Sequence, residues 1–296
     1  MSEAGLDSLF PMERLSVNGL VEPLRRLPEL LARRRGLARH LRTQAPRVFL
    51  GIDSPDFNLG LARAVRASGI PTAQLVSPSV WAWRRGRLKG IARSVDLMLC
   101  LFPFETEVYR ERGIPARCVG HPMADEIAGP VDSAQARRAL GLPREVPLLA
   151  LLPGSRAGEV EALMPLFLQA ADHLRLGFPA LNLVVPAASA QRMLQLRAMV
   201  RGVPGITLVQ GQSRQAIAAA DAVLVAAGTA TLEAALLRRP MVVAYRMHGA
   251  SWFVLSRLVR TPWVALPNLL AGRELVSEFL QDAATPEALA GSLASL

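Results

Sequence analysis

Residues 148–163 read LLALLPGSRAGEVEAL, a short apolar strand followed by a Pro-Gly turn and the beginning of a helix. Such a turn leaves backbone N–H groups without partners at a helix N-terminus, where they stabilise an anion. Arg156 adds a positive charge that can bind a phosphate through two hydrogen bonds. Gly154, Ser155 and Arg156 are therefore predicted to hold the diphosphate of a nucleotide-sugar. The same pattern is typical of any ordinary strand-to-helix loop, so other motifs must decide between the two interpretations.

The composition favours an anionic partner. Of the 296 residues, 51% are hydrophobic and 20% charged, and the net charge is +10, with an isoelectric point near 11.2. Excess positive charge attracts nucleic acid, phosphorylated substrates or acidic membrane surfaces. Aromatic residues make up only 5% of the chain. Because base-stacking surfaces need aromatic rings, we expect no nucleic-acid partner.

Several other classes are disfavoured by motifs that the sequence lacks. Cys100 and Cys118 lie in apolar, strand-like runs without metal-ligand spacing, which indicates free thiols and a reducing compartment. The sequence has no DxD, HExxH, P-loop or GxSxG motif, so we expect neither a metal nor another cofactor. We find no signal peptide and no apolar run of the roughly 20 residues that span a membrane. Any membrane contact should be peripheral.

Short apolar strands alternate with helical patterns along the chain, which predicts an α/β fold with parallel sheets covered by helices. A helical pattern with leucines three and four residues apart dominates residues 12–46; it suits either a membrane surface or a solvated surface helix. Proline-rich residues around 128–146 suggest a linker between two halves that face across a cleft. The predicted domains are residues 1–130 and 147–296, joined by a linker at 131–146. The predicted strands are 48–52, 72–77, 96–101, 117–120, 148–152, 182–187, 206–210, 222–227 and 241–245.

Polar residues after the strands are the places to look for chemistry, because ligands of such sheets bind beyond the carboxyl ends of the strands. Asp53 follows the first strand in DSPDFN (53–58) and is a candidate general base. The alternative is that Asp53 and Asp56 only form the turn and cap the next helix, which is usual for Asp beside Pro.

Three further segments have both a functional and an ordinary interpretation. SPSVWAWRRGRLKG (77–90) places two tryptophans beside arginines, as at a lipid–water interface, or else as a core Trp pair next to a solvated helix. GTATLEAALLRRP (228–240) is a second glycine turn whose Glu233 could accept hydrogen bonds from ribose hydroxyls, or else favour the helix dipole. PNLLAGRELV (267–276) contributes a loop with Asn268, Arg273 and Glu274, either a substrate loop or a helix start.

In this order and spacing, the motifs resemble those of the lipid A disaccharide synthase family, from about residue 10 onward. The motifs are GIDSPDFN (51–58), SPSVWAWR (77–84), PFE (103–105), GHPMAD (120–125), LLPGSR and GEVE (151–161), GTATLE (228–233), YRM (245–247) and LPNLLAGRELV (266–276).

The resemblance implies two Rossmann-like domains of the GT-B glycosyltransferase type, an N-terminal acceptor and membrane domain and a C-terminal UDP-sugar domain. It implies inverting transfer from UDP-2,3-diacylglucosamine to the 6-hydroxyl of 2,3-diacylglucosamine 1-phosphate (lipid X). The products are lipid A disaccharide 1-phosphate and UDP, in lipopolysaccharide biosynthesis. It also implies a cytoplasmic protein bound peripherally to the anionic inner face of the bacterial inner membrane, and a homodimer of the full-length protein.

Matched position by position, the family implies roles for particular residues. Asp53 matches the catalytic base, with Asn268 and Arg273 as further catalytic residues. The implied donor-binding residues are Gly154, Ser155, Arg156, Gly228, Thr229, Glu233, Arg246 and Glu274. The implied acceptor and membrane residues are Trp81, Trp83, Arg84, Arg85 and Arg87.

The sequence also departs from the family pattern. The family opens with a strand and a loop reading roughly GExSGD, upstream of the segment that Met1 matches, and it continues with helices beyond the segment that Leu296 matches. We therefore expect an N-terminal domain without its first βαβ unit and with apolar residues exposed on a strand edge. Two alternatives stay open: a UDP-sugar epimerase-like GT-B enzyme, and an inactive fragment that binds UDP or membrane.

Overall fold

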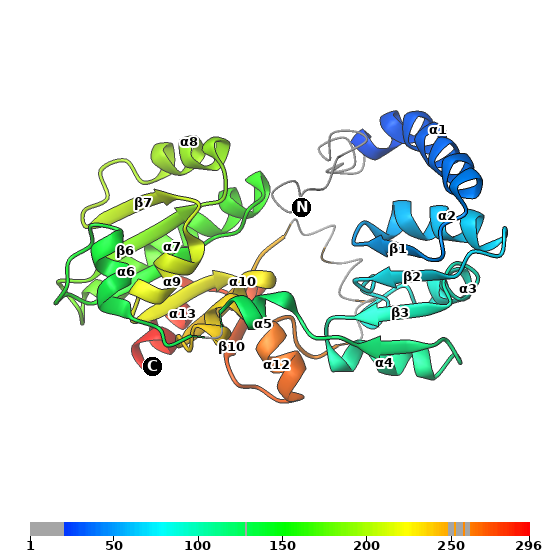
Figure 1. Ribbon diagram of the computed structural model, residues 1–296. Coiled ribbons are helices and arrows are strands. Elements are labelled where there is room, and N and C mark those ends of the chain that lie inside the picture. The colour runs from blue at the N-terminus through cyan, green and yellow to red at the C-terminus, as the bar shows by residue number, and fades with distance from the viewer. Residues whose placement is uncertain (1–20, 128, 248–251, 253–256, 258–260) are drawn as a thin grey trace. The chain divides into compact units, whose positions relative to one another are not determined.

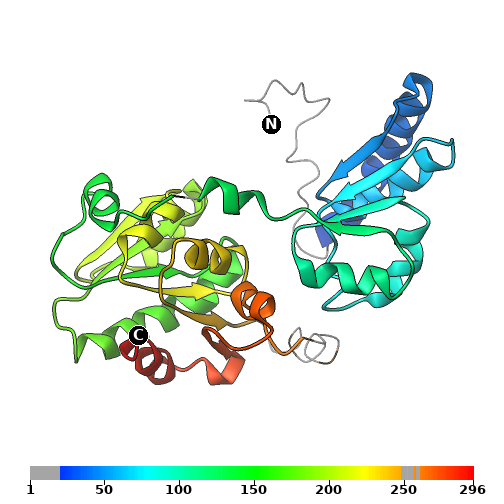
Figure 2. The ribbon, with the colours of Figure 1, turned by 60° about the horizontal axis from the view of Figure 1, so that its bottom comes forward.

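A computed structural model describes residues 21–127, 129–247, 252, 257 and 261–296 of the chain, with side chains from residue 27 onward. The chain forms two compact units, Met1–Gly120 and His121–Leu296. Figure 1 shows unit 1 in blue to green and unit 2 in green to red, and Figure 2 shows both from a second side. Within the described residues, no helix is both long enough and apolar enough to cross a membrane.

Unit 1 is built on a four-stranded parallel sheet in the order β1-β2-β3-β4. Each strand is short and each connection returns to the same end of the sheet, as short apolar runs separated by helical patterns predict. Its elements are α1 (Val21–Gln44), β1 (Phe49–Ile52), α2 (Pro55–Arg66), β2 (Thr72–Leu75), η3 (Arg85–Arg87), α3 (Leu88–Ala92), β3 (Leu97–Cys100), α4 (Pro103–Arg110) and β4 (Ala116–Cys118). The part of the predicted 12–46 helix before residue 21 lies outside the described residues.

One face of this sheet carries the core of unit 1. Met98 and Cys100 of β3 are fully buried and pack with Val108 and Tyr109 of α4. Leu59 of α2 joins the same cluster, so α2 and α4 cover the same face.

The opposite face is open at β1, the edge strand. Val48, just before β1, alternates with Leu50 and Ile52 of the strand, and the three are 42–57% exposed. The register places Leu50 beside Ala73 and Ile52 beside Leu75. In the described part of the chain, none of these side chains belongs to a buried cluster. β1 therefore exposes apolar side chains on the face opposite the core of unit 1.

Unit 2 is built on a six-stranded parallel sheet in the order β10-β9-β8-β5-β6-β7. All five residues of β5 are buried, because helices cover both faces of its centre. The strands are β5 (Leu148–Leu152), β6 (Asn182–Ala187), β7 (Ile206–Gln210), β8 (Ala222–Ala226), β9 (Met241–Tyr245) and β10 (Ser277–Leu280). The helices are α5 (Pro122–Glu126), α6 (Ser133–Ala139), α7 (Ala157–Arg175), α8 (Ala190–Met199), α9 (Ser213–Ala219), α10 (Thr229–Leu236), α12 (Leu266–Ala271), η4 (Gln281–Ala283) and α13 (Pro286–Ala294).

Every strand predicted from the sequence is present, and the α/β fold with parallel sheets is confirmed. β10 was not predicted. The division of the chain falls after Gly120, whereas the sequence placed the domain boundary at residue 130. The predicted linker 131–146 contains α6, which packs on α9 through buried Ala136.

Candidate functional site

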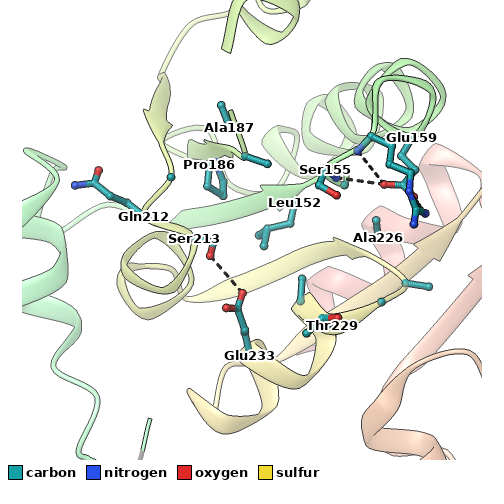
Figure 3. Close-up of a pocket in the computed structure, with 17 residues that line it drawn as sticks. Leu152, Ser155, Glu159, Pro186, Ala187, Gln212, Ser213, Ala226, Thr229 and Glu233 are labelled. Atoms are coloured by element: carbon teal, nitrogen blue, oxygen red, sulfur yellow. Dashed lines mark hydrogen bonds and ion pairs between the residues drawn. The ribbon is translucent and has the colours of Figure 1, made fainter. Parts of the chain in front are cut away.

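A cavity of about 510 Å³ lies in unit 2 at the carboxyl ends of β5, β6, β7 and β8. Figure 3 shows side chains from the loops after these strands converging on it. The cavity brings together six of the predicted donor-binding residues: Gly154, Ser155, Arg156, Gly228, Thr229 and Glu233. These loops meet at one edge because parallel strands all end there.

The turn after β5 needs glycine at position 154. Gly154 has a φ of +111°, and a Cβ there would lie 2.5 Å from Oε2 and 2.8 Å from Cβ of Glu159. L-residues avoid this backbone region, and the close approach of Glu159 leaves no room for a side chain.

Glu159 occupies the predicted anion donors of this turn. Its Oε2 accepts hydrogen bonds from the backbone N–H groups of Ser155 and Arg156, both at 3.2 Å. Its Oε1 lies 2.8 Å from Nη1 of Arg156. Figure 3 shows the Glu159 carboxylate turned back onto the turn. The groups that the sequence assigned to a diphosphate are thus already bound to a carboxylate of the same helix.

The turn after β8 has its backbone donors better placed for a ligand. Gly228 has a φ of +144° and caps α10, with open space where a Cβ would stand. The N–H groups of Thr229 and Ala230, both on the cavity wall, belong to the first helical turn, whose N–H groups have no intrahelical acceptor. An anion in the cavity can reach them.

Glu233 is held on the cavity wall by the loop after β7. Its carboxylate lies 3.3 Å from Oγ of Ser213 and 3.4 Å from Nε of Arg214. Arg214 also binds Glu126 of α5 at 2.6 Å, and this hydrogen bond raises the pKa of its guanidinium above the usual value. Only 15% of the Glu233 side chain is exposed, so its two oxygens are fixed in direction.

The walls of the cavity that come from the ends of β6 and β7 were not predicted from the sequence. Ala187, Ala188, Gly211, Gln212 and Ser213 all line the cavity. They lie at or just after the carboxyl ends of β6 and β7, so the rule that pointed to residues 154 and 228 would also have found them.

Four predicted site residues of unit 2 lie outside the lining of this cavity: Asn268, Arg246, Arg273 and Glu274. Asn268 is fully buried; its Oδ1 accepts from the N–H groups of Leu275 and Val276, and its Nδ2 donates to Glu278. A catalytic role through contact with substrate conflicts with this burial. Arg246 is outside the cavity lining, because its guanidinium donates to the carbonyl oxygen of Ala284 at 2.7 Å.

Arg273 and Glu274 are exposed on the loop after α12 and do not line the cavity. Gly272, with a φ of +63°, ends α12 in front of them. The Asn268 hydrogen bonds fix the far side of the same loop, so Asn268 shapes the loop that carries the two charged residues.

Asp53 lies at the carboxyl end of β1 in unit 1 and its side chain is exposed. Asp53 and Ser54 both have a left-handed backbone, with φ of 52° and 41°. Ser54, rather than Asp56, is the N-cap residue of α2, and Asp56 binds Arg87 in an ion pair. The carboxylate of Asp53 makes no hydrogen bond or ion pair with the described part of the chain.

The predicted acceptor and membrane residues make separate pairwise contacts in unit 1. The half-buried ring of Trp81 packs edge-on against Phe104 at 4.8 Å between ring centroids, while Arg84 lies 4.0 Å from the ring centroid of Trp83. Two of the arginines have acidic partners, Arg85 with Glu111 and Arg87 with Asp56. Both tryptophans are half-buried, so part of each ring faces solvent. Among the described residues, no group of His, Cys, Asp and Glu is arranged to hold a metal ion.

The fold matches solved structures of a UDP-GlcNAc 2-epimerase and a glycosyltransferase. UDP-GlcNAc 2-epimerase of Methanocaldococcus jannaschii aligns over 99% of this chain and 79% of its own, with a TM-score of 0.62 and 11% identity. A Rickettsia africae glycosyltransferase aligns over 90% of this chain and 70% of its own, with a TM-score of 0.53 and 9% identity. At these identities the similarity establishes the GT-B type fold alone.

The sequence comparisons decide the family. A family profile described as lipid-A-disaccharide synthetase matches residues 1–296. Lipid-A-disaccharide synthases of Pseudomonas aeruginosa strain PAO1 and Pseudomonas putida strain GB-1 are both 55% identical to this chain, over 100% of it and 79% of each relative.

The chain belongs to the lipid-A-disaccharide synthase family. It is a glycosyltransferase of lipid A biosynthesis. The resemblance found in the sequence motifs is therefore confirmed. The epimerase alternative rests on a shared fold only, since epimerases appear among the structural neighbours and not among these sequence relatives.

Proposed function

We propose that the unit 2 cavity binds the UDP part of UDP-2,3-diacylglucosamine. The observation that carries this proposal is the convergence of two glycine turns and Glu233 on one cavity of about 510 Å³. The backbone donors at the start of α10 bind the diphosphate, and Arg156 supplies a positive charge next to it. The oxygens of Glu233 accept hydrogen bonds from the ribose hydroxyls. The similar M. jannaschii epimerase structure contains UDP-GlcNAc and UDP, which supports a nucleotide-sugar on this fold.

Asp53 is the general base in the proposed reaction. It takes the proton from the 6-hydroxyl of the acceptor, lipid X, whose oxygen attacks the anomeric carbon of the donor sugar with inversion. The bond to the diphosphate breaks and UDP leaves. An exposed carboxylate at a strand end can act as a general base. General base catalysis accelerates a reaction by roughly 10²–10⁴-fold. The loop with Arg273 and Glu274, held by Asn268, lies beside the donor in this proposal.

Both substrates carry acyl chains, so the reaction takes place at an anionic membrane surface. The half-exposed rings of Trp81 and Trp83 suit the headgroup level, and Arg84, Arg85 and Arg87 add positive charge beside them. In this proposal the protein lies on the inner face of the inner membrane. Unit 1 contacts the lipid and unit 2 binds the nucleotide. The full-length protein is a homodimer in this proposal.

The test is a turnover assay with UDP-2,3-diacylglucosamine and lipid X, combined with calorimetry of UDP binding. We expect disaccharide and released UDP in equal amounts. Asp53→Asn should lower kcat by at least about a hundredfold and leave the Kd of UDP unchanged. Asp56→Asn is the matched control, because it removes a neighbouring carboxylate that is bound to Arg87.

The other outcomes separate the alternatives. Normal turnover by Asp53→Asn would contradict the assignment of Asp53 as the general base. UDP binding without product favours a binding fragment, and conversion of unacylated UDP-N-acetylglucosamine favours an epimerase. Glu233→Gln should weaken UDP binding about tenfold; unchanged binding contradicts its contact with the ribose.

A further inference from the structure

The turn that carries Asp53 has an unfavourable backbone conformation. Asp53 and Ser54 are consecutive, neither is glycine, and both adopt the left-handed conformation, with φ of 52° and 41°. In this conformation the Cβ atom approaches the following carbonyl oxygen, so non-glycine residues adopt it rarely and mostly singly. Two such residues in a row persist only where surrounding contacts determine the conformation.

Those contacts come from two amide side chains that meet at one atom. The carbonyl oxygen of Asp53 accepts a hydrogen bond from Nδ2 of Asn58 at 2.8 Å and another from Nε2 of Gln74 at 3.0 Å. Asn58 belongs to α2 and Gln74 to β2, so the oxygen is held from the helix and from the neighbouring strand. The N–H of Asp53 donates to the carbonyl oxygen of Leu75 at 3.0 Å. Both main-chain polar groups of Asp53 are therefore fixed.

The two amides also bind the last residues of β1 and β2. Nδ2 of Asn58 donates to the carbonyl oxygen of Ile52 at 3.1 Å, and Nε2 of Gln74 donates to that of Leu75 at 2.9 Å. The ends of β1 and β2 are thus joined through side chains just where the ladder between the strands stops.

Gln74 is an unfavourable choice for stability alone. It is fully buried, and its Oε1 has no hydrogen-bond partner in the described structure. A buried acceptor without a partner destabilises the fold, and such an atom calls for an explanation. Gly51 makes the space for it, because a Cβ at that position would overlap Oε1 of Gln74. Position 74 therefore has a glutamine whose Nε2 donates hydrogen bonds at the turn while its Oε1 has no partner in the described structure.

We propose that Gln74 and Asn58 are positioning residues for the reaction, which fix the Asp53–Ser54 turn so that the Asp53 carboxylate stays at the productive place. This inference rests on the proposed role of Asp53 as general base. Neither amide touches substrate; each acts through the main chain of Asp53. A displacement of the base by about 1 Å is enough to cost about a hundredfold in rate.

The test uses the full chain and Gln74→Met, which keeps the side-chain length and removes the donor. We expect kcat to fall roughly 10- to 100-fold, with the KM of both substrates unchanged, because binding does not depend on the position of the base. Thr72→Val is the matched control: Thr72 is buried two residues earlier on the same face of β2 and bonds to Ser94. It should leave kcat unchanged.

A second variant separates positioning from simple loss of structure. Ser54→Gly removes the backbone penalty at the turn, because glycine adopts positive φ freely. Introduced into Gln74→Met, it should restore a large part of kcat. If Gln74 has only a structural role, Ser54→Gly will not restore the kcat of Gln74→Met.

A measurement without turnover completes the test. The ¹³C chemical shifts of Cα and Cβ of selectively labelled Asp and Ser report the backbone conformation at Asp53 and Ser54. Gln74→Met and Asn58→Asp should move these resonances away from left-handed values, while Thr72→Val should not. Unchanged resonances together with an unchanged kcat in Gln74→Met overturn the proposal. If Asp53→Asn keeps normal turnover while the resonances move, the turn is held as proposed and the assignment of the base has failed instead.

Discussion

Oε1 of Glu159 lies 2.8 Å from Nη1 of Arg156, and Oε2 of the same carboxylate accepts the backbone N–H groups of the turn before α7. The turn predicted to hold a diphosphate thus already binds an anion of its own chain. Glu159 stands three residues after Arg156, at the N3 position, where a Glu satisfies the free donors of a helix start. A diphosphate that used these donors would have to displace it.

Glu159→Gln should therefore strengthen UDP binding. Glutamine at N3 can still accept from the turn, while the negative charge that opposes a diphosphate is gone. We expect the Kd of UDP to fall by about three- to tenfold in calorimetry at moderate salt. Glu161→Gln makes the same change of charge at an exposed position on the same helix and should change the Kd little. If Glu159→Gln and Glu161→Gln changed the Kd of UDP equally, the net charge of the protein alone would explain the effect.

Gly154→Ala should lose UDP binding and stability. A Cβ would meet Glu159 at 2.5–2.8 Å on a backbone with φ of +111°, and such a substitution destabilises by about 1–3 kcal/mol. Gly158→Ala is the matched control inside α7, where a Cβ meets nothing within 4 Å; it should stabilise by about 0.5–1 kcal/mol. Urea unfolding and UDP titration of both variants check the pair. Equal stability of the Gly154→Ala and Gly158→Ala variants would mean that the turn rearranges to accommodate a Cβ at position 154.

The sequence predicted this part of the structure well because its signals are local. The central strands β5, β8 and β9 are continuous apolar runs, as expected for strands buried on both faces, and the glycine turns come shortly after β5 and β8. β10 was missed because SEFL is half-buried throughout and includes Glu278, so it gives no apolar run.

Side-chain direction could not be predicted, since tertiary contacts determine it. Arg246 directly follows β9, as a ligand-binding residue would, but the carbonyl oxygen of Ala284 draws it away from the cavity. Asn268 stands in a loop motif, yet its amide is turned inward to bond Leu275, Val276 and Glu278. Both contacts join segments whose proximity no local pattern encodes.

The predicted linker region also makes contacts that no local sequence pattern encodes. Residues 131–146 contain prolines and glycines, which are typical of a linker, but Arg137 is 8% exposed and anchors them to the sheet. Its guanidinium binds Asp221 through two bonds of 2.9 Å and also donates to the carbonyl oxygens of Ala219, Arg144 and Val146. A polar anchor of this kind leaves no hydrophobic pattern in the sequence.

Arg137→Met should destabilise unit 2 by about 3 kcal/mol or more, because several buried carbonyl oxygens lose their donor at once. Arg138→Met is the matched control, since Arg138 is exposed next to it, and should change stability by less than about 0.5 kcal/mol. Urea unfolding followed by UDP binding or by circular dichroism measures both. A loss below about 1 kcal/mol for Arg137→Met would mean that water replaces the guanidinium.

Glu105 in unit 1 gives a prediction for pH. Burial raises the pKa of its carboxyl above the usual value, although the N–H groups of Phe102 and Leu101 donate to it and act in the opposite direction. The folded state therefore holds the proton more tightly than the unfolded chain. The stabilisation from Glu105 is fully present below the unfolded pKa near 4.5 and is lost as the pH rises through the folded pKa.

Glu105→Gln should remove this dependence while it preserves an acceptor for the helix start. The free energy of unfolding of the variant minus that of the wild type should become more positive from about pH 4 to about pH 8. Tryptophan fluorescence in a Trp252→Phe, Trp263→Phe background reports unit 1, because Trp81 and Trp83 then remain. Glu107→Gln, an exposed position on the same α4 helix, is the matched control for the loss of one carboxylate from this helix. A difference for Glu105→Gln that stays flat or falls with pH would mean that the folded carboxyl holds its proton no more tightly than the unfolded one.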